Sequence, residues 1–255
     1  MEKSNLTRSV HKGRSQNSEP KIVEWTEKPW NPITGCVKVS TGCANCYAEK
    51  TADWLQRINN PRYKNGFRLT LHEDLLDEPL KWRKPRRIFI GSMSDIFQRA
   101  IPEDFVLRAF ETMNQSPQHT FIVLTKRADR MEELSAKINW TDNIWLGVTV
   151  EEAAYKDRID CLRNTPAVRK FVCAEPLIGD LGQVNLTGID WLVIGGESGP
   201  NSRPMDEEWV VSLRDQCRLQ NVMFTFKQWG GVKRKENGSL LQGEYHHDLP
   251  AVMRD

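Results

Sequence analysis

Short, nearly continuous apolar runs recur along the chain, and each leads through polar residues into a segment with helical periodicity. These runs fall near residues 22–25 and at 87–91, 120–124, 144–148, 170–174, 191–194 and 222–226. Strands of a parallel sheet have this composition because both of their faces are buried. The pattern therefore predicts about seven parallel strands, the first of them just before a cysteine-rich loop at residues 36–46.

Amphipathic segments separate the runs. Apolar residues at 105, 109, 110 and 113 share one helical face, and similar faces recur within 47–58, 131–138, 155–162 and 210–217. Pro102 opens one of these helices and Asp206 opens another, as helix starts favour. The segment 175–189 is short and glycine-rich, so we expect no full helix there.

Alternating strands and helices predict an α/β fold. We expect a single-domain (β/α) barrel, partial or complete, and an open doubly wound sheet is the alternative. The chain has no G-x-G-x-x-G and no G-x-x-x-x-G-K-[ST] sequence, so neither dinucleotide nor P-loop chemistry is indicated.

Composition narrows the class of protein. The 255 residues are 39% apolar and 27% charged, which suits a globular protein with one large core. The net charge of +2 gives no strong electrostatic case for nucleic acid. Residues 1–20 are polar, and we expect them to form a disordered lead without the apolar stretch of a signal peptide. One domain is expected at 21–255. No segment approaches the ~20 apolar residues of a membrane span, and the thiols fit a reducing cytoplasm.

Three cysteines form the pattern C-x6-C-x2-C: Cys36, Cys43 and Cys46. A structural zinc site takes four protein ligands, and so do most electron-transfer iron–sulfur clusters. Three thiolates can instead hold three irons of a [4Fe–4S] cluster and leave the fourth iron open. A zinc site completed by His72, His246 or His247, and a loop without metal, are the alternatives. The remaining cysteines read as buried free thiols: Cys161, Cys173 and Cys217.

Charged and polar residues follow the predicted strands, where the active site of a β/α barrel lies. Glu175 and Glu197 directly follow apolar runs, so each would lie close to the core, where an unpaired charge is costly. Carboxylates and cations together suit a zwitterionic, ribose-bearing ligand such as S-adenosylmethionine (SAM). Loops after strands are often polar without any such role, however. The candidates are Ser94, Asp95, Lys126, Arg127, Glu151, Glu175, Glu197 and Lys227.

Several long strings resemble a phage- and prophage-associated family, the three-Cys-motif family of unknown function. The resemblance runs from about Ile22 to the end of the chain, and the family is itself similar to radical SAM proteins. The usual radical SAM spacing is C-x3-C-x2-C, so the first gap is longer here. The matching strings are Glu24-Trp25-Thr26, 30–36, 38–49, 89–95, 124–127, 147–151, 174–177, 195–200 with Arg203-Pro204, 226–230 and 240–250.

The resemblance implies a [4Fe–4S] enzyme that binds SAM at the open iron and cleaves it with an electron from an external donor. A 5′-deoxyadenosyl radical would then modify or repair a substrate. Cys36, Cys43 and Cys46 would be the cluster ligands, and the strand-end residues would line the pocket for SAM and substrate. Phage association favours a nucleotide or a nucleic-acid base as substrate. The competing hypothesis is a non-catalytic zinc or iron–sulfur module that interacts with nucleic acid. Nothing in the sequence indicates the oligomeric state.

Overall fold

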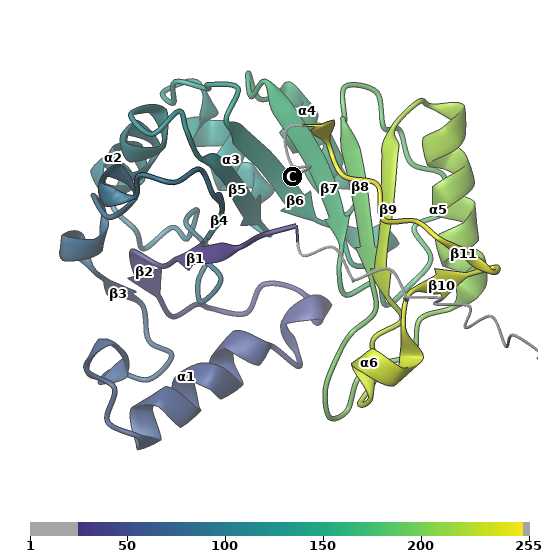
Figure 1. Ribbon diagram of the computed structural model, residues 1–255, viewed down its shortest axis with the longest axis horizontal. Coiled ribbons are helices and arrows are strands. Elements are labelled where there is room, and N and C mark those ends of the chain that lie inside the picture. The colour runs from purple at the N-terminus through teal and green to yellow at the C-terminus, as the bar shows by residue number, and fades with distance from the viewer. Residues whose placement is uncertain (1–24, 252–255) are drawn as a thin grey trace, which may run out of the picture.

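The computed structural model describes residues 25–251, in which helices cover one side of a curled seven-stranded parallel sheet (Figure 1). The strands of this sheet are β1 (Lys28–Trp30), β4 (Arg87–Ile90), β5 (Thr120–Thr125), β6 (Ile144–Thr149), β7 (Arg169–Ala174), β8 (Trp191–Gly195) and β9 (Met223–Gln228). The helices are α1 (Tyr47–Arg57), α2 (Glu103–Asn114), α3 (Ala128–Ser135), α4 (Asp157–Asn164), α5 (Glu207–Leu219) and α6 (Arg234–Asn237). Two small antiparallel pairs are β2 (Ile33–Thr34) with β3 (Thr70–Leu71), and β10 (Leu240–Leu241) with β11 (Glu244–Tyr245).

The strand order confirms a partial β/α barrel. The sheet runs β1-β4-β5-β6-β7-β8-β9, and each neighbouring pair is parallel. Strands therefore follow one another in chain order, whereas a doubly wound sheet reverses its order at a switch point. Strands β1 and β9 form the two edges and do not pair with each other, so the barrel stays open along one side.

The expected strand at 22–25 falls mostly outside the described residues, and Trp25, the one described residue of it, is not in a strand. Strand β1 is Lys28–Trp30, and residues 22–24, like the predicted lead at 1–20, lie outside the described residues. Strand β1 contains Pro29, which has no N–H for a ladder and suits only an edge strand. Trp25 instead packs on the concave side of the sheet, with its ring centroid 5.7 Å from that of Phe171 and 5.5 Å from that of Trp191. The apolar character of Trp25 thus reflects packing against the sheet and not membership of a strand.

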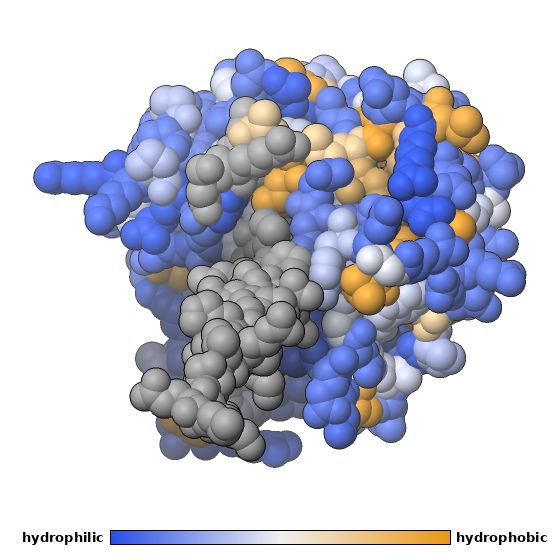
Figure 2. Space-filling model, turned by 45° about the vertical axis from the view of Figure 1, so that its right-hand side comes forward, coloured by the Kyte–Doolittle hydropathy of each residue, from blue (hydrophilic) through white to orange (hydrophobic). Residues whose placement is uncertain are grey.

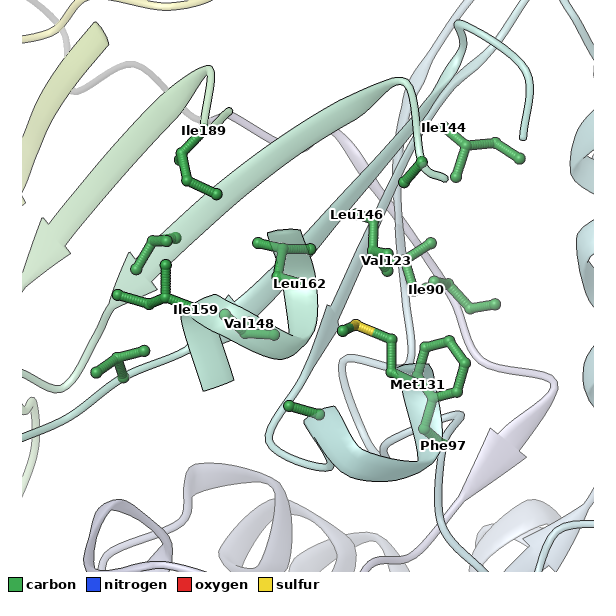
Figure 3. Packing of buried hydrophobic residues seen from close by; sticks show 14 of the residues in the cluster. Ile90, Phe97, Val123, Met131, Ile144, Leu146, Val148, Ile159, Leu162 and Ile189 are labelled. Carbon is green, nitrogen blue, oxygen red and sulfur yellow. The ribbon is translucent and has the colours of Figure 1, made fainter. Parts of the chain in front are cut away.

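Both faces of the sheet are buried, which explains the continuous apolar runs. On the outer face, Met131 of α3 and Leu162 of α4 pack over Val123, Leu146 and their neighbours, as Figure 3 shows. On the concave face, a second cluster fills the interior of the half-barrel: Trp25, Ile122, Trp145, Phe171, Cys173, Trp191, Val193 and Leu249. Full burial of each large apolar side chain stabilises the fold by roughly 1.5–3 kcal/mol.

One glycine of the sheet is required by this packing. A Cβ on Gly147 of β6 would lie 2.4 Å from the ring of Phe171 on β7. The ring therefore occupies the space that a side chain on β6 would need. As predicted, no helix connects β7 to β8 in the segment 175–190.

The surface outside the sheet is mostly polar. Hydrophilic residues cover most of the face in Figure 2, and apolar ones show mainly near its top. Within residues 25–251, no helix combines the length and the apolar composition that crossing a membrane requires. Helix α1 lies apart from α2 to α5, beneath the sheet in Figure 1.

Candidate functional site

A cavity of about 680 Å³ lies where the strands end and the cysteine loop begins. This volume is within the roughly 300–1,000 Å³ of small-molecule sites. Glu151 is the one predicted site residue that does not line it. The predicted residues that do are Cys36, Cys43, Cys46, Ser94, Asp95, Lys126, Arg127, Glu175, Glu197 and Lys227.

The three thiols share this cavity but contact different partners. The Cys36 sulfur accepts a 3.6 Å contact from Nη2 of Arg127, and the Cys43 sulfur lies 3.6 Å from Oγ of Ser40. All three cysteines are free and half-buried. In the part of the chain that the structure describes, no three His, Cys, Asp or Glu side chains are arranged to hold a metal ion. The donor chemistry thus fits a three-thiolate site, but the loop must draw the sulfurs together to form one.

The histidines that could have completed a zinc site do not line the cavity. Nε2 of His72 lies 2.9 Å from Oγ1 of Thr34, and Nε2 of His247 lies 2.8 Å from Oγ of Ser239. The ring of His246 packs against Phe224 at a centroid distance of 5.5 Å. Within residues 25–251, no histidine therefore lies at the cavity as a fourth ligand beside the three cysteines.

The thiols differ in how readily they ionise. Burial raises the pKa of Cys36 to about 11, although Arg127 partly offsets it. Burial would also raise the pKa of Cys43. Hydrogen bonds from the backbone of Val39 and from Ser40, with the charge of Lys126, outweigh it and lower that pKa. Because metals bind thiolates, Cys43 is the better prepared ligand of the two.

Asp95 holds the start of the cysteine loop through Arg127. Its carboxylate accepts hydrogen bonds from Oγ1 of Thr125 at 2.8 Å, from the backbone N–H of Lys126 at 3.1 Å and from Nη1 of Arg127 at 2.8 Å. Nη2 of Arg127 then donates to the carbonyl of Val37 at 2.7 Å. The buried ion pair joins Asp95, which follows β4, to Arg127, which follows β5. Through Arg127 it is hydrogen-bonded to Val37, the residue after Cys36.

Glu151 holds the middle of the loop. Oγ of Ser40 donates to this carboxylate at 2.6 Å, and Lys126 and Arg158 neutralise it at 3.0 and 2.8 Å. Burial would raise the pKa of Glu151, but Lys126, Ser40 and Arg158 lower it. A Cβ on Gly42 would lie 2.5 Å from the Glu151 side chain, so a glycine is needed where the loop approaches it.

Glu197 holds the end of the loop. Nδ2 of Asn45, next to Cys46, donates to Oε2 of Glu197 at 3.0 Å. Nε of Arg203 donates to the same oxygen at 2.9 Å, while its Nη1 donates to the carbonyl of Thr41 at 3.0 Å. Burial would raise the pKa of Glu197, but the hydrogen bonds from Arg203 and Asn45 lower it to about 2.

Glu175 differs from the other three carboxylates because, within residues 25–251, it forms no hydrogen bond or ion pair with the cysteine loop. Its partners are Nζ of Lys227 at 2.6 Å and Nε2 of Gln228 at 2.6 Å. Burial would raise the pKa of Glu175, but Lys227 lowers it. The Lys227 ammonium also lies 4.9 Å from the ring centroid of Trp25. This group of side chains faces the cavity from β7 and β9.

A sequence model of the family described as "Protein of unknown function (DUF5131)" matches residues 20–250. The chain belongs to this family. The match spans every residue that lines the cavity. No curated protein and no solved structure matches the chain.

Several residues at this DUF5131 site were not predicted from the sequence. Ser40, Asn45 and Arg203 hold the loop in place, and Arg158 neutralises Glu151. Tyr47, the first residue of α1, donates its hydroxyl to the carbonyl of Ser92. Ser40, Asn45 and Tyr47 lie within or beside the cysteine motif. The motif therefore indicated that they belong to the site, but it did not indicate which residues they contact.

Proposed function

We propose that this chain is a radical SAM-type iron–sulfur enzyme. The observation that carries the proposal is that three free thiols of one loop line the same cavity as the charged strand ends. Within residues 25–251 no histidine lines this cavity. The fourth cysteine that does, Cys173, is buried on β7, and burial raises its pKa to about 12, which favours an open cluster over a closed four-ligand metal site. The partial β/α barrel places this cavity at the strand ends, where such folds have their active sites.

The bound [4Fe–4S] cluster would supply the reductive cleavage of SAM, with an electron from an external donor. Cys36, Cys43 and Cys46 would hold it. Glu151 and Glu197 accept hydrogen bonds from the loop, and Asp95 is linked to it through Arg127, so their role would be to hold the thiols in position. Rigid support of this kind places reacting groups to within fractions of an ångström.

The side chains left to bind SAM are those that face the cavity without holding the loop. Oγ of Ser94 has no hydrogen-bond partner and could accept or donate to a ligand. Lys126 lies close enough to Cys43 for its charge to lower the pKa of that thiol, so its ammonium also lies close to the cluster ligands. A cation in that position suits the carboxylate of SAM.

The cellular setting belongs to the same proposal. Six free cysteines suit a reducing cytoplasm. Phage or prophage association, and a nucleotide or nucleic-acid base as substrate, would follow from the resemblance of the cysteine motif region to the phage-associated family.

The test is SAM binding and cleavage by the cluster-loaded, reduced protein. We expect calorimetry to detect SAM binding, and chromatography to detect 5′-deoxyadenosine, even without substrate. An intact cluster that binds no SAM at millimolar concentration would contradict the proposal. The protein would then be better described as a non-catalytic iron–sulfur or zinc module.

A further inference from the structure

The charges around the cavity are not evenly matched. Asp95 pairs with Arg127, Glu197 with Arg203 and Glu175 with Lys227, and Lys126 pairs with the buried Glu151. Arg234 also lines the cavity, yet it forms no ion pair with any residue in 25–251. Glu27 and Lys28 also line it; Glu27 pairs with Arg87, and the Lys28 ammonium lies 4.3 Å from the ring centroid of Trp82. Among the guanidinium groups that line the cavity in residues 25–251, Arg234 is therefore left without a counter-charge.

Arg234 belongs to the group around Glu175. Its Nη2 lies 3.4 Å from Oε1 of Gln228, at the long end of hydrogen-bond distance. Nε2 of the same Gln228 donates to Glu175, and Lys227 pairs with that carboxylate. The charge of Arg234 also helps to lower the pKa of Glu175. Two cations and one carboxylate thus share this group, which leaves one net positive charge.

An apolar wall stands next to these charges. Trp25, Phe89 and Leu124 line the cavity, and Trp25 lies beneath the Lys227 ammonium. The wall belongs to the concave side of the sheet. A flat apolar group could lie along it while a charged group reaches Arg234.

We infer that Glu175, Lys227 and Arg234 form the substrate end of the cavity, and that they bind an oxyanion carried on a flat apolar body. Phosphate and carboxylate groups share this chemistry, because the guanidinium fork of arginine can bind either with two hydrogen bonds. The inference rests on the proposed function for its division of the cavity into a cofactor end and a substrate end. The anion site itself does not require the cluster.

The competing use of this group is to bind SAM. SAM carries a carboxylate and ribose hydroxyls, so Arg234 could meet the first and Glu175 the second. The two uses predict opposite effects of the Glu175 charge on ligand binding. Glu175 repels a substrate oxyanion and occupies Lys227, whereas it would attract the hydroxyls or the amino group of SAM.

The experiment measures binding of phenyl phosphate and benzoate to the full-length, metal-free protein by calorimetry. We expect at least one of them to bind with a Kd in the millimolar range or below, and the two arms separate phosphate from carboxylate recognition. Arg234→Gln should weaken binding at least tenfold. Glu175→Gln should strengthen it at least threefold, because it frees Lys227 and removes the repulsion.

Lys233→Gln is the matched control. Lys233 precedes Arg234, pairs on the surface with Glu236 and does not line the cavity. The control should bind both probes as the wild type does. Arg234 is exposed, so its variant should keep the wild-type melting temperature and iron uptake.

Three results would overturn the inference. The first is no binding of either probe, and the second is equal loss in Arg234→Gln and Lys233→Gln. The third is displacement of the probe by SAM from the cluster-loaded protein together with weaker probe binding in Glu175→Gln. If the probes bind as expected but no cluster forms, the proposed function fails and the anion site remains.

Discussion

Replacing Glu197 with glutamine tests whether the strand-end carboxylates hold the cysteine loop. Glu197 follows β8 and accepts hydrogen bonds from Asn45 at 3.0 Å and from Nε of Arg203 at 2.9 Å. Arg203 in turn donates to the carbonyl of Thr41. Glutamine keeps the shape of the side chain, removes its charge and turns one acceptor into a donor that faces Arg203.

The magnitude follows from the pKa of Glu197. The folded protein lowers it from 4.5 to about 2, a difference of about 2.5 units. At about 1.4 kcal/mol per unit, the ionised form stabilises the fold by up to about 3 kcal/mol at neutral pH. The Glu197 side chain is only 6% exposed, but that of Arg203 is 32% exposed, so solvent screens part of this energy. We therefore expect Glu197→Gln to lower the free energy of unfolding by about 2 kcal/mol.

Urea unfolding at pH 7 measures this difference. The matched control is Glu133→Gln, since Glu133 pairs with Arg99 at 3.3 Å but both side chains are exposed, at 55% and 63%. The control should lose less than about 0.5 kcal/mol. Equal losses in the two variants would refute the assignment of Glu197 as a residue that holds the loop.

Three further predictions concern stability and the loop. Gly147→Ala should destabilise the fold by roughly 1–3 kcal/mol, because its Cβ meets Phe171, and Phe171→Leu should recover part of the loss in the double variant; additive losses in urea would contradict this packing. Gly42→Ala places a Cβ 2.5 Å from the buried Glu151 side chain, which Ser40, Lys126 and Arg158 hold in place, so we expect it to cost roughly 1–3 kcal/mol in urea and to speed amide hydrogen exchange in residues 40–46; unchanged stability and exchange would count against a close approach there. Since folding lowers the pKa of the carboxylates at 151, 175 and 197, their contribution is complete above pH 4.5 and is lost as pH falls toward 2; urea midpoints that do not fall between pH 5 and pH 3 would exclude this linkage.

The sequence predicted the sheet well where burial is two-sided. Runs such as 144–148 are apolar on both faces because helices cover one side and the aromatic cluster fills the other. Strand β1 was not predicted, because an edge strand of three residues that includes Pro29 leaves almost no pattern. Trp25 looked like a strand residue since its burial comes from long-range packing on the concave face.

The site could be located from the sequence, but its internal pairing could not. Polar residues after parallel strands meet at one end of the sheet, so their convergence follows from topology alone. The partners of each carboxylate depend on contacts across long stretches of chain, such as Ser40 with Glu151 and Asn45 with Glu197. No local pattern encodes which carboxylate binds the loop and which faces the cavity.

Anaerobic reconstitution with iron and sulfide tests whether Cys36, Cys43 and Cys46 hold an iron–sulfur cluster. We expect about four irons and four sulfides per chain, with broad visible absorption, as in thiolate-bound [4Fe–4S] clusters. Alanine at any one of Cys36, Cys43 or Cys46 should remove most of this iron, while alanine at the buried Cys217 should leave it unchanged. One tightly bound zinc per chain without iron uptake, or equal iron in all of these variants, would contradict a cluster held by these three cysteines.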